Sequence, residues 1–152
     1  MTILNIFDPQ TTASVLARLE NLKYDTVPQW GKMNASQVLA HLNVSYDLAY
    51  GRKESKSNFL MKFIVKTFIK PIVVGEKAYG RNSGTAPVFI ISDNRDFEAE
   101  KAKLIENIKT TEKNGAQYFE GKLNASFGVM SAKEWNNMFY KHIDHHFTQF
   151  GI

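Results

Sequence analysis

The chain has 152 residues, a net charge of +4, 43% hydrophobic and 22% charged residues, and no cysteine. This composition is typical of a globular protein with a sizeable core, not of a disordered chain. The lack of cysteine excludes disulfides, thiolate metal sites and cysteine nucleophiles, so any metal would have to be held by nitrogen and oxygen ligands.

Clear helix-start signals occur in the first third of the chain. Asp8 is placed as an N-cap, with Pro9 at the first helical position. An apolar stripe at helical spacing follows, formed by Val15, Leu16, Leu19 and Leu22. A second helix is predicted to open at Asn34, with Gln37 as its capping-box partner, and to run to about Tyr50.

A third helix is predicted over Asn58–Lys70, where Pro71 ends or kinks it. Its lysines form a ladder opposite the apolar side chains Phe59, Leu60, Phe63, Ile64, Phe68 and Ile69. We expect this apolar face to pack in the bundle or in a dimer interface rather than on an anionic membrane. Val74–Ser92 is predicted to be a long irregular connection that contains one short extended piece, Val88–Ile91.

Two further helices complete the prediction. One starts near Asp93-Asn94 and runs to Lys113, before Asn114-Gly115. The last starts at Ser131, with Glu134 completing a capping box, and continues nearly to the C-terminus. We therefore predict an all-α fold and a single domain over residues 1–152. Its architecture would be a four-helix bundle with an extra short helix and a long irregular connection.

The first eight residues and the charge distribution bear on the compartment of the protein and on its binding to membranes and nucleic acids. Residues 1–8 lack the basic start and the apolar stretch of a secretory signal, so we expect a cytoplasmic protein. The longest apolar stretch, Phe59–Val74, is interrupted by lysines, which argues against stable membrane insertion. The lysines are spread among acids along the chain, so we expect no nucleic-acid binding.

The last predicted helix carries the most informative residues. His142 and His146 are four residues apart, so their rings project from one helical face about one turn apart. Trp135, Phe139 and Gln149 share this stripe, which turns the pair toward the core. His145 is about 100° round the helix and belongs at the edge of the site. Two buried imidazoles need donors and acceptors, which either a metal ion or structural hydrogen bonds can supply.

His41 is the natural third ligand. It lies in the middle of the second predicted helix, where Gln37 and Ser45 are its neighbours at spacing four. A lone inward histidine is usually structural, but one that faces a two-histidine helix across a core completes a metal site. Three protein ligands leave coordination positions open, which is typical of a catalytic site. The walls are predicted to come from Gln37, Ser45, Trp135 and Phe139, with Gln149 near the rim.

Two stretches of the chain resemble motifs of the DinB/YfiT-like metalloenzymes. The first comprises Trp30-Gly31-Lys32-Met33, Ser36-Gln37 and Ala40-His41. The second comprises Tyr140-Lys141-His142-Ile143-Asp144-His145-His146 and Gln149-Phe150-Gly151. The pair Phe127-Gly128 is similar to one that precedes the final helix in an uncharacterised bacterial branch of that superfamily.

This resemblance covers most of the chain. It implies a four-helix core in which His41, His142 and His146 bind one metal, and a metal-dependent hydrolase or thiol transferase that is often dimeric. One departure is visible: a His-Pro pair is expected shortly before the Phe-Gly pair, and this chain has Asn124-Ala125. Any role of that loop histidine therefore does not carry over.

Two functions remain open at this stage. The first is a metal-dependent enzyme acting on a small molecule, with zinc, nickel, iron or manganese as the divalent ion. The second is a non-catalytic helical module with a structural or sensing metal site. No general base is placed by spacing among the candidates Asp47, Asp93, Asp96 and Asp144, and Asp144 falls on the far side of its helix. The segment from Gly75 to Pro87 is predicted to be a lid.

Overall fold

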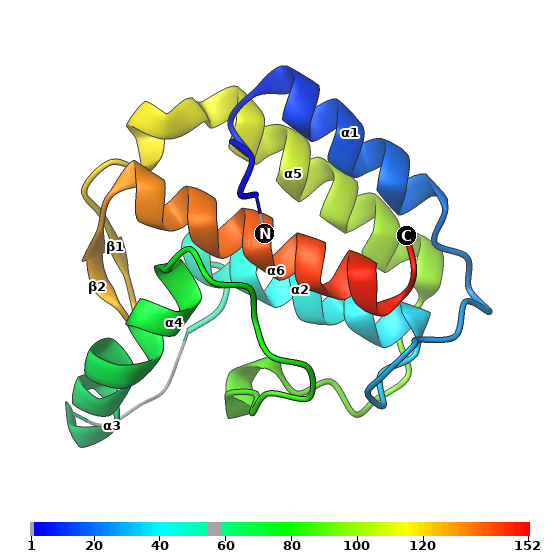
Figure 1. Ribbon diagram of the computed structural model, residues 1–152, viewed down its shortest axis with the longest axis horizontal. Helices are drawn as coiled ribbons and strands as arrows, with labels where there is room; N and C mark the ends of the chain where they lie inside the picture. Colours follow the sequence, from blue (N-terminus) through cyan, green and yellow to red (C-terminus); the bar gives the residue numbers. More distant parts are fainter. Residues whose placement is uncertain (1, 55–58) are drawn as a thin grey trace.

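Figure 1 shows the computed structural model of the protein, which is mostly helical. The structure describes residues 2–54 and 59–152. Its four longest helices are α1 (Pro9–Glu20), α2 (Ala35–Ala49), α5 (Phe97–Phe119) and α6 (Ala132–Gln149). Helix α5 packs against α1, α2 and α6, and α2 also packs against α6. The predicted all-α class is confirmed, and the single tight strand pair is a small addition to it.

The predicted helix starts are confirmed at three positions. Asp8 accepts a hydrogen bond from the backbone of Thr11, which caps α1 ahead of Pro9. Asn34 with Gln37, and Ser131 with Glu134, each form a complete capping box at the start of α2 and α6. These contacts are local, which is why the sequence alone located them.

Helix α5 differs from its prediction at both ends. It begins after Asp96, whose side chain caps the Ala99 backbone, rather than at Asp93-Asn94. The predicted stop at Gly115 is a kink with φ 69° and ψ 173°, after which the helix resumes to Phe119. An antiparallel hairpin of β1 (Lys122–Asn124) and β2 (Gly128–Met130) follows, and the sequence analysis did not predict it.

An arm projects from the body at the lower left of Figure 1. It consists of α3 (Phe59–Ile64), the π-helical segment η1 (Val65–Ile69) and α4 (Lys70–Val74); the predicted start at Asn58 lies outside the described residues. Lys70 N bonds to Val65 O, so the π-helical turn accommodates Pro71, which has no N–H of its own.

The arm does not bury its apolar face in the bundle, contrary to one of the two packings expected. Val65, Val73 and Val74 contact the core. Seven other large side chains of the arm are 39–65% exposed, namely Leu60, Met61, Phe63, Ile64, Phe68, Ile69 and Ile72. The reason is the placement of the lysines: Lys70 pairs with Glu134 on α6, and Lys66 lies close to Gly128, so the lysine side faces the body.

The connection from α4 to α5 is irregular, as predicted, except for a 3₁₀ turn η2 (Pro87–Phe89) within the stretch expected to be extended. The core lies between the four long helices and is rich in aromatic rings, with Phe119, Trp135 and Phe139 fully buried. Among the described residues, no helix is both long enough and apolar enough to cross a membrane.

Candidate metal centre

Three histidines from two helices converge at one point. His41 comes from the middle of α2, and His142 and His146 come from neighbouring turns of α6. One ring nitrogen from each lies within 4.8 Å of the others, and the Nε2 atoms of His41 and His142 are 2.9 Å apart. The predicted convergence is confirmed, and this group could hold a metal ion.

The environment keeps these rings neutral. Burial lowers the pKa of His41, and it lowers the pKa of His142 well below the usual value. Burial, reinforced by the nearby His41, lowers the pKa of His146 to about 3. Since neutral imidazole is the form that ligates a metal, no proton has to leave these rings at neutral pH.

Hydrogen bonds on the outer side of the rings select the tautomer. His41 Nδ1 lies 2.9 Å from the carbonyl oxygen of Phe89, and His146 Nδ1 lies 2.7 Å from Gln149 Oε1. Both partners are carbonyl oxygens and can only accept, so each Nδ1 carries the proton. The lone pair of each ring is then on Nε2. This is the second layer of contacts that orients histidines in metal sites.

Gln149 is itself held in place by the loop before α2. Its Nε2 donates to the carbonyl oxygen of Trp30 at 2.7 Å. Gly31 has φ +85°, and a Cβ at this position would collide with Gln149 Nε2. The positive φ favours glycine at position 31, and any larger residue would displace the amide of Gln149, the side chain that orients His146. Gln149, predicted to lie near the rim, is a direct partner of a candidate ligand.

A buried lysine anchors the wall beside the site. The side chain of Lys141 is fully buried, and its Nζ donates to the carbonyl oxygens of Ile72, Val73 and Gly75 at 2.8, 3.1 and 2.6 Å. Burial lowers the pKa of Lys141 to about 8. Its Nζ also lies 4.5 Å from the ring centre of Tyr79, whose hydroxyl donates to Val73 O. Lys141 thus ties the end of α4 and the following loop to α6.

His145 lies at the edge, as predicted, and is not part of the ligand group. Its ring centre is 5.9 Å from that of Trp30 and 5.7 Å from that of Tyr79. The Arg81 guanidinium lies 4.3 Å from the centre of the Trp30 ring, so the loop predicted as a lid covers this edge. Phe89, farther along the same connection, packs beside His41 and His142.

The other four predicted wall residues have different partners. Gln37 closes the capping box of α2, and Ser45 Oγ donates to Leu42 O within the same helix. Trp135 and Phe139 are fully buried, and their rings stack with centres 5.6 Å apart in the aromatic core. They lie on the histidine stripe of α6, but one and two turns toward its N-terminus, where α2 and α5 close over them. The structure does not bring these four residues to the histidines through any contact described.

Within residues 2–54 and 59–152, no carboxylate belongs to the histidine group. Asp144 pairs with Arg18 at 2.7 Å on the far side of α6, and Asp47 pairs with Lys103 at 2.7 Å. Asp93 pairs with Arg95, and Asp96 caps α5. The four candidate general bases are therefore engaged elsewhere.

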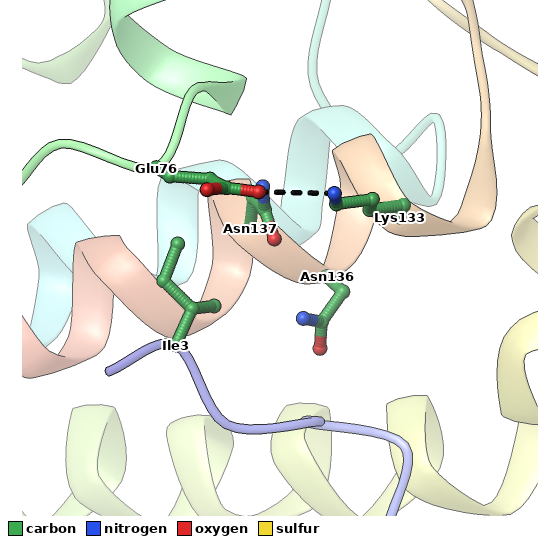
Figure 2. Close-up of a pocket in the computed structure, with 5 residues that line it drawn as sticks. All are labelled: Ile3, Glu76, Lys133, Asn136 and Asn137. Atoms are coloured by element: carbon green, nitrogen blue, oxygen red, sulfur yellow. Dashed lines mark hydrogen bonds and ion pairs between the residues drawn. The ribbon is translucent and has the colours of Figure 1, made fainter. Parts of the chain in front are cut away.

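Two surface cavities lie away from the histidines. Figure 2 shows one of about 320 Å³, lined by Ile3, Glu76, Lys133, Asn136 and Asn137, with an ion pair between Glu76 and Lys133 across it. A second of about 350 Å³ lies along residues 24–34. Of the three candidate ligands, His41 and His146 are buried and His142 is half-buried.

The model of one protein family, DUF1569, matches residues 4–151. The chain is a member of the DUF1569 family. That family is described as proteins of unknown function, so membership shows ancestry but no activity. No curated protein and no solved structure matches this DUF1569 protein.

Sequence reasoning missed four residues that shape the centre of this DUF1569 protein: Phe89, Tyr79, Arg81 and Lys141. Phe89 contributes a backbone carbonyl, which leaves no mark in a sequence. Lys141 carries a weak signal, because Tyr140 before it and Ile143 two residues after it are apolar and buried, and a lysine on that face requires buried partners. Tyr79 and Arg81 lie in the irregular connection, where no periodicity predicts a direction.

Proposed function

We propose that this DUF1569 protein is a metal-dependent enzyme that acts on a small molecule through His41, His142 and His146. The observation that carries this proposal is the convergence of three neutral imidazoles, two of which have Nδ1 bound to a carbonyl oxygen so that Nε2 faces the group. Without an ion, His41 Nε2 can accept a hydrogen bond from His142 Nε2 at 2.9 Å, but no donor to His146 Nε2 occurs among the residues that the structure describes.

The residues fit a divalent ion of the imidazole-binding kind. Zinc, nickel or iron suits nitrogen-only ligands better than manganese does. When bound, such an ion supplies Lewis acidity toward water, a thiol or a carbonyl group. Three protein ligands and the partial exposure of His142 support access by substrate. Hydrolysis of a small ester or amide and transfer of a low-molecular-weight thiol are the two reactions we propose.

The remaining expectations stay proposals. The motif resemblance supports a DinB/YfiT-like bundle formed by residues 1–152 as one domain. We propose a cytoplasmic homodimer without nucleic-acid binding. The exposed apolar side chains of the α3–α4 arm support dimerisation, because monomers rarely leave so many large apolar groups in solvent.

A non-catalytic module is the second candidate. It is favoured by the two cavities described, neither of which is lined by a histidine, and by the engagement of the nearby acids in other pairs. In that case the metal would stabilise the fold or report metal concentration.

Metal loading of matched variants tests the proposal. His146→Ala should abolish stoichiometric binding of zinc or nickel, while His145→Ala, one residue along the helix, should retain it. The metal-loaded wild type and His142→Ala are then compared on a panel of small esters, amides and thiol-transfer pairs. Activity of the wild type alone supports the enzyme. Equal rates across the panel, together with unfolding of the wild type on chelation, support the structural module.

A further inference from the structure

The Arg81 guanidinium is linked to the candidate ligand His146 through the rings of Trp30 and His145. No ion pair or hydrogen bond of Arg81 occurs among residues 2–54 and 59–152. Its only described contact is with the face of Trp30, at 4.3 Å from the ring centre. Stacking of this kind uses the flat face of the guanidinium, while the N–H donors lie in its plane and remain free.

The turn that carries Arg81 is well defined. Ser83 Oγ donates to Gly80 O at 2.7 Å, and Asn82 has φ 55°, a left-handed conformation that asparagine tolerates. The start of the same loop is tied to α6 by Lys141 and Tyr79. These contacts order the backbone on both sides of Arg81, and the Trp30 ring places its guanidinium.

A metal ion bound at the centre would carry a net positive charge, as Arg81 does. Three neutral imidazoles leave a divalent ion with its whole charge, and no carboxylate joins them. Trp30 connects this charge to Arg81, because its ring packs on His145 and its carbonyl holds Gln149, the partner of His146. Arg81 and a bound ion would be two positive centres linked through Trp30; Asp144, the acid that acts on His145, is paired with Arg18, so the pair favours an anion.

We infer that the substrate of this site carries a carboxylate, or a group with the same oxyanion chemistry, which Arg81 binds while another donor of the substrate reaches the metal. The inference rests on the proposed metal-dependent function. A guanidinium held flat against an indole can bind a carboxylate with two parallel hydrogen bonds, which gives orientation as well as affinity. Arg81 is thus a specificity-determining residue.

The alternative is that Arg81 only covers Trp30. Under that reading, its removal would change the free energy of unfolding and leave ligand preference untouched. The two readings are separated by comparing ligands that differ in charge alone.

The probes are monohydroxamates of dicarboxylic acids, from succinic to suberic, each matched with its primary amide. The hydroxamate end binds the metal, and the other end is either anionic or neutral. Binding is followed by the visible absorption of the cobalt(II)-loaded protein, which reports ligands at the metal directly. The proteins are the wild type, Arg81→Gln, Arg81→Lys and the charge control Lys133→Gln, whose side chain lies 74% exposed near the start of α6.

At one chain length or more, the wild type should bind the carboxylate about tenfold more tightly than its amide, as expected for a charge-assisted pair. Arg81→Gln should bring this ratio to about one without changing affinity for the amide, Arg81→Lys should retain part of it, and Lys133→Gln should keep it. Two results overturn the inference while leaving the metal site standing. The first is a carboxylate-to-amide affinity ratio near one in the wild type at every chain length, and the second is a tenfold ratio that persists in Arg81→Gln. If no hydroxamate perturbs the spectrum of stoichiometrically bound cobalt, the open metal site and the inference both fail.

Discussion

The substitution Gly31→Ala tests whether the contact between Gln149 and His146 controls the metal centre. A Cβ at position 31 would collide with Gln149 Nε2, the atom that donates to Trp30 O. The amide group of Gln149 would have to move, and the hydrogen bond from His146 Nδ1 to Gln149 Oε1 would be lost with it. The ring of His146 would then lose the partner that fixes its tautomer.

Two contributions set the size of the effect. An alanine in the left-handed conformation costs about 1–2 kcal/mol. Loss of the two hydrogen bonds of Gln149 costs about 1 kcal/mol each, so the free energy of unfolding of the metal-free protein should fall by roughly 3–4 kcal/mol. Metal affinity should fall about 10–100-fold, the usual effect of removing an outer-shell partner of a ligand.

Gly51→Ala is the matched control. Gly51 also has a positive φ, +69°, but a Cβ there meets nothing within 4 Å. Gly51→Ala should lose only the roughly 1–2 kcal/mol that an alanine costs in the left-handed conformation, and its metal affinity should be unchanged. Urea unfolding in the presence of a chelator measures the free energy of unfolding, and competition with a chromophoric chelator measures the metal affinity. Wild-type metal affinity in Gly31→Ala, or an equal loss in both variants, would refute the role assigned to Gln149.

Three further predictions follow from the same contacts. The folded-state pKa of His146, about 3, lies below its unfolded value of 6.5, so its contribution to stability is present above pH 6.5 and is lost as pH falls toward 3. His146→Gln should therefore reduce the pH dependence of metal-free unfolding by about 1.4 kcal/mol per pH unit between pH 6 and 5, and an unchanged slope would contradict this. Lys141→Met should destabilise the protein by about 3 kcal/mol and expose the following loop to proteolysis, because three backbone carbonyls lose their donor; protection equal to wild type in limited proteolysis would argue against that anchor. Phe63→Ser and Phe68→Ser should each change the free energy of unfolding by no more than about 0.5 kcal/mol, since both side chains are exposed, yet shift the protein from dimer to monomer in sedimentation. A wild type that sediments as a monomer would remove the dimer proposal.

Local chemistry accounts for what the sequence by itself determined. The caps at Asp8, Asn34 and Ser131 depend on side chains and backbone groups within three residues of one another, so their geometry follows from the sequence. The common face of His142 and His146 follows from helical periodicity in the same way. The pairing with His41 was also predictable, because an inward polar side chain in a core requires a partner.

Only the tertiary structure decided which groups surround the three histidines. Phe89 O lies 48 residues from His41 in sequence, and Trp30 O lies 119 residues from Gln149, so their meeting depends on how the connections pack. The same holds for the arm: Lys70 pairs with Glu134 and Lys66 lies near the hairpin, while seven large apolar side chains stay exposed. Backbone carbonyls and loop directions leave no periodic signal, because they are determined by the sum of distant contacts rather than by any neighbouring residue.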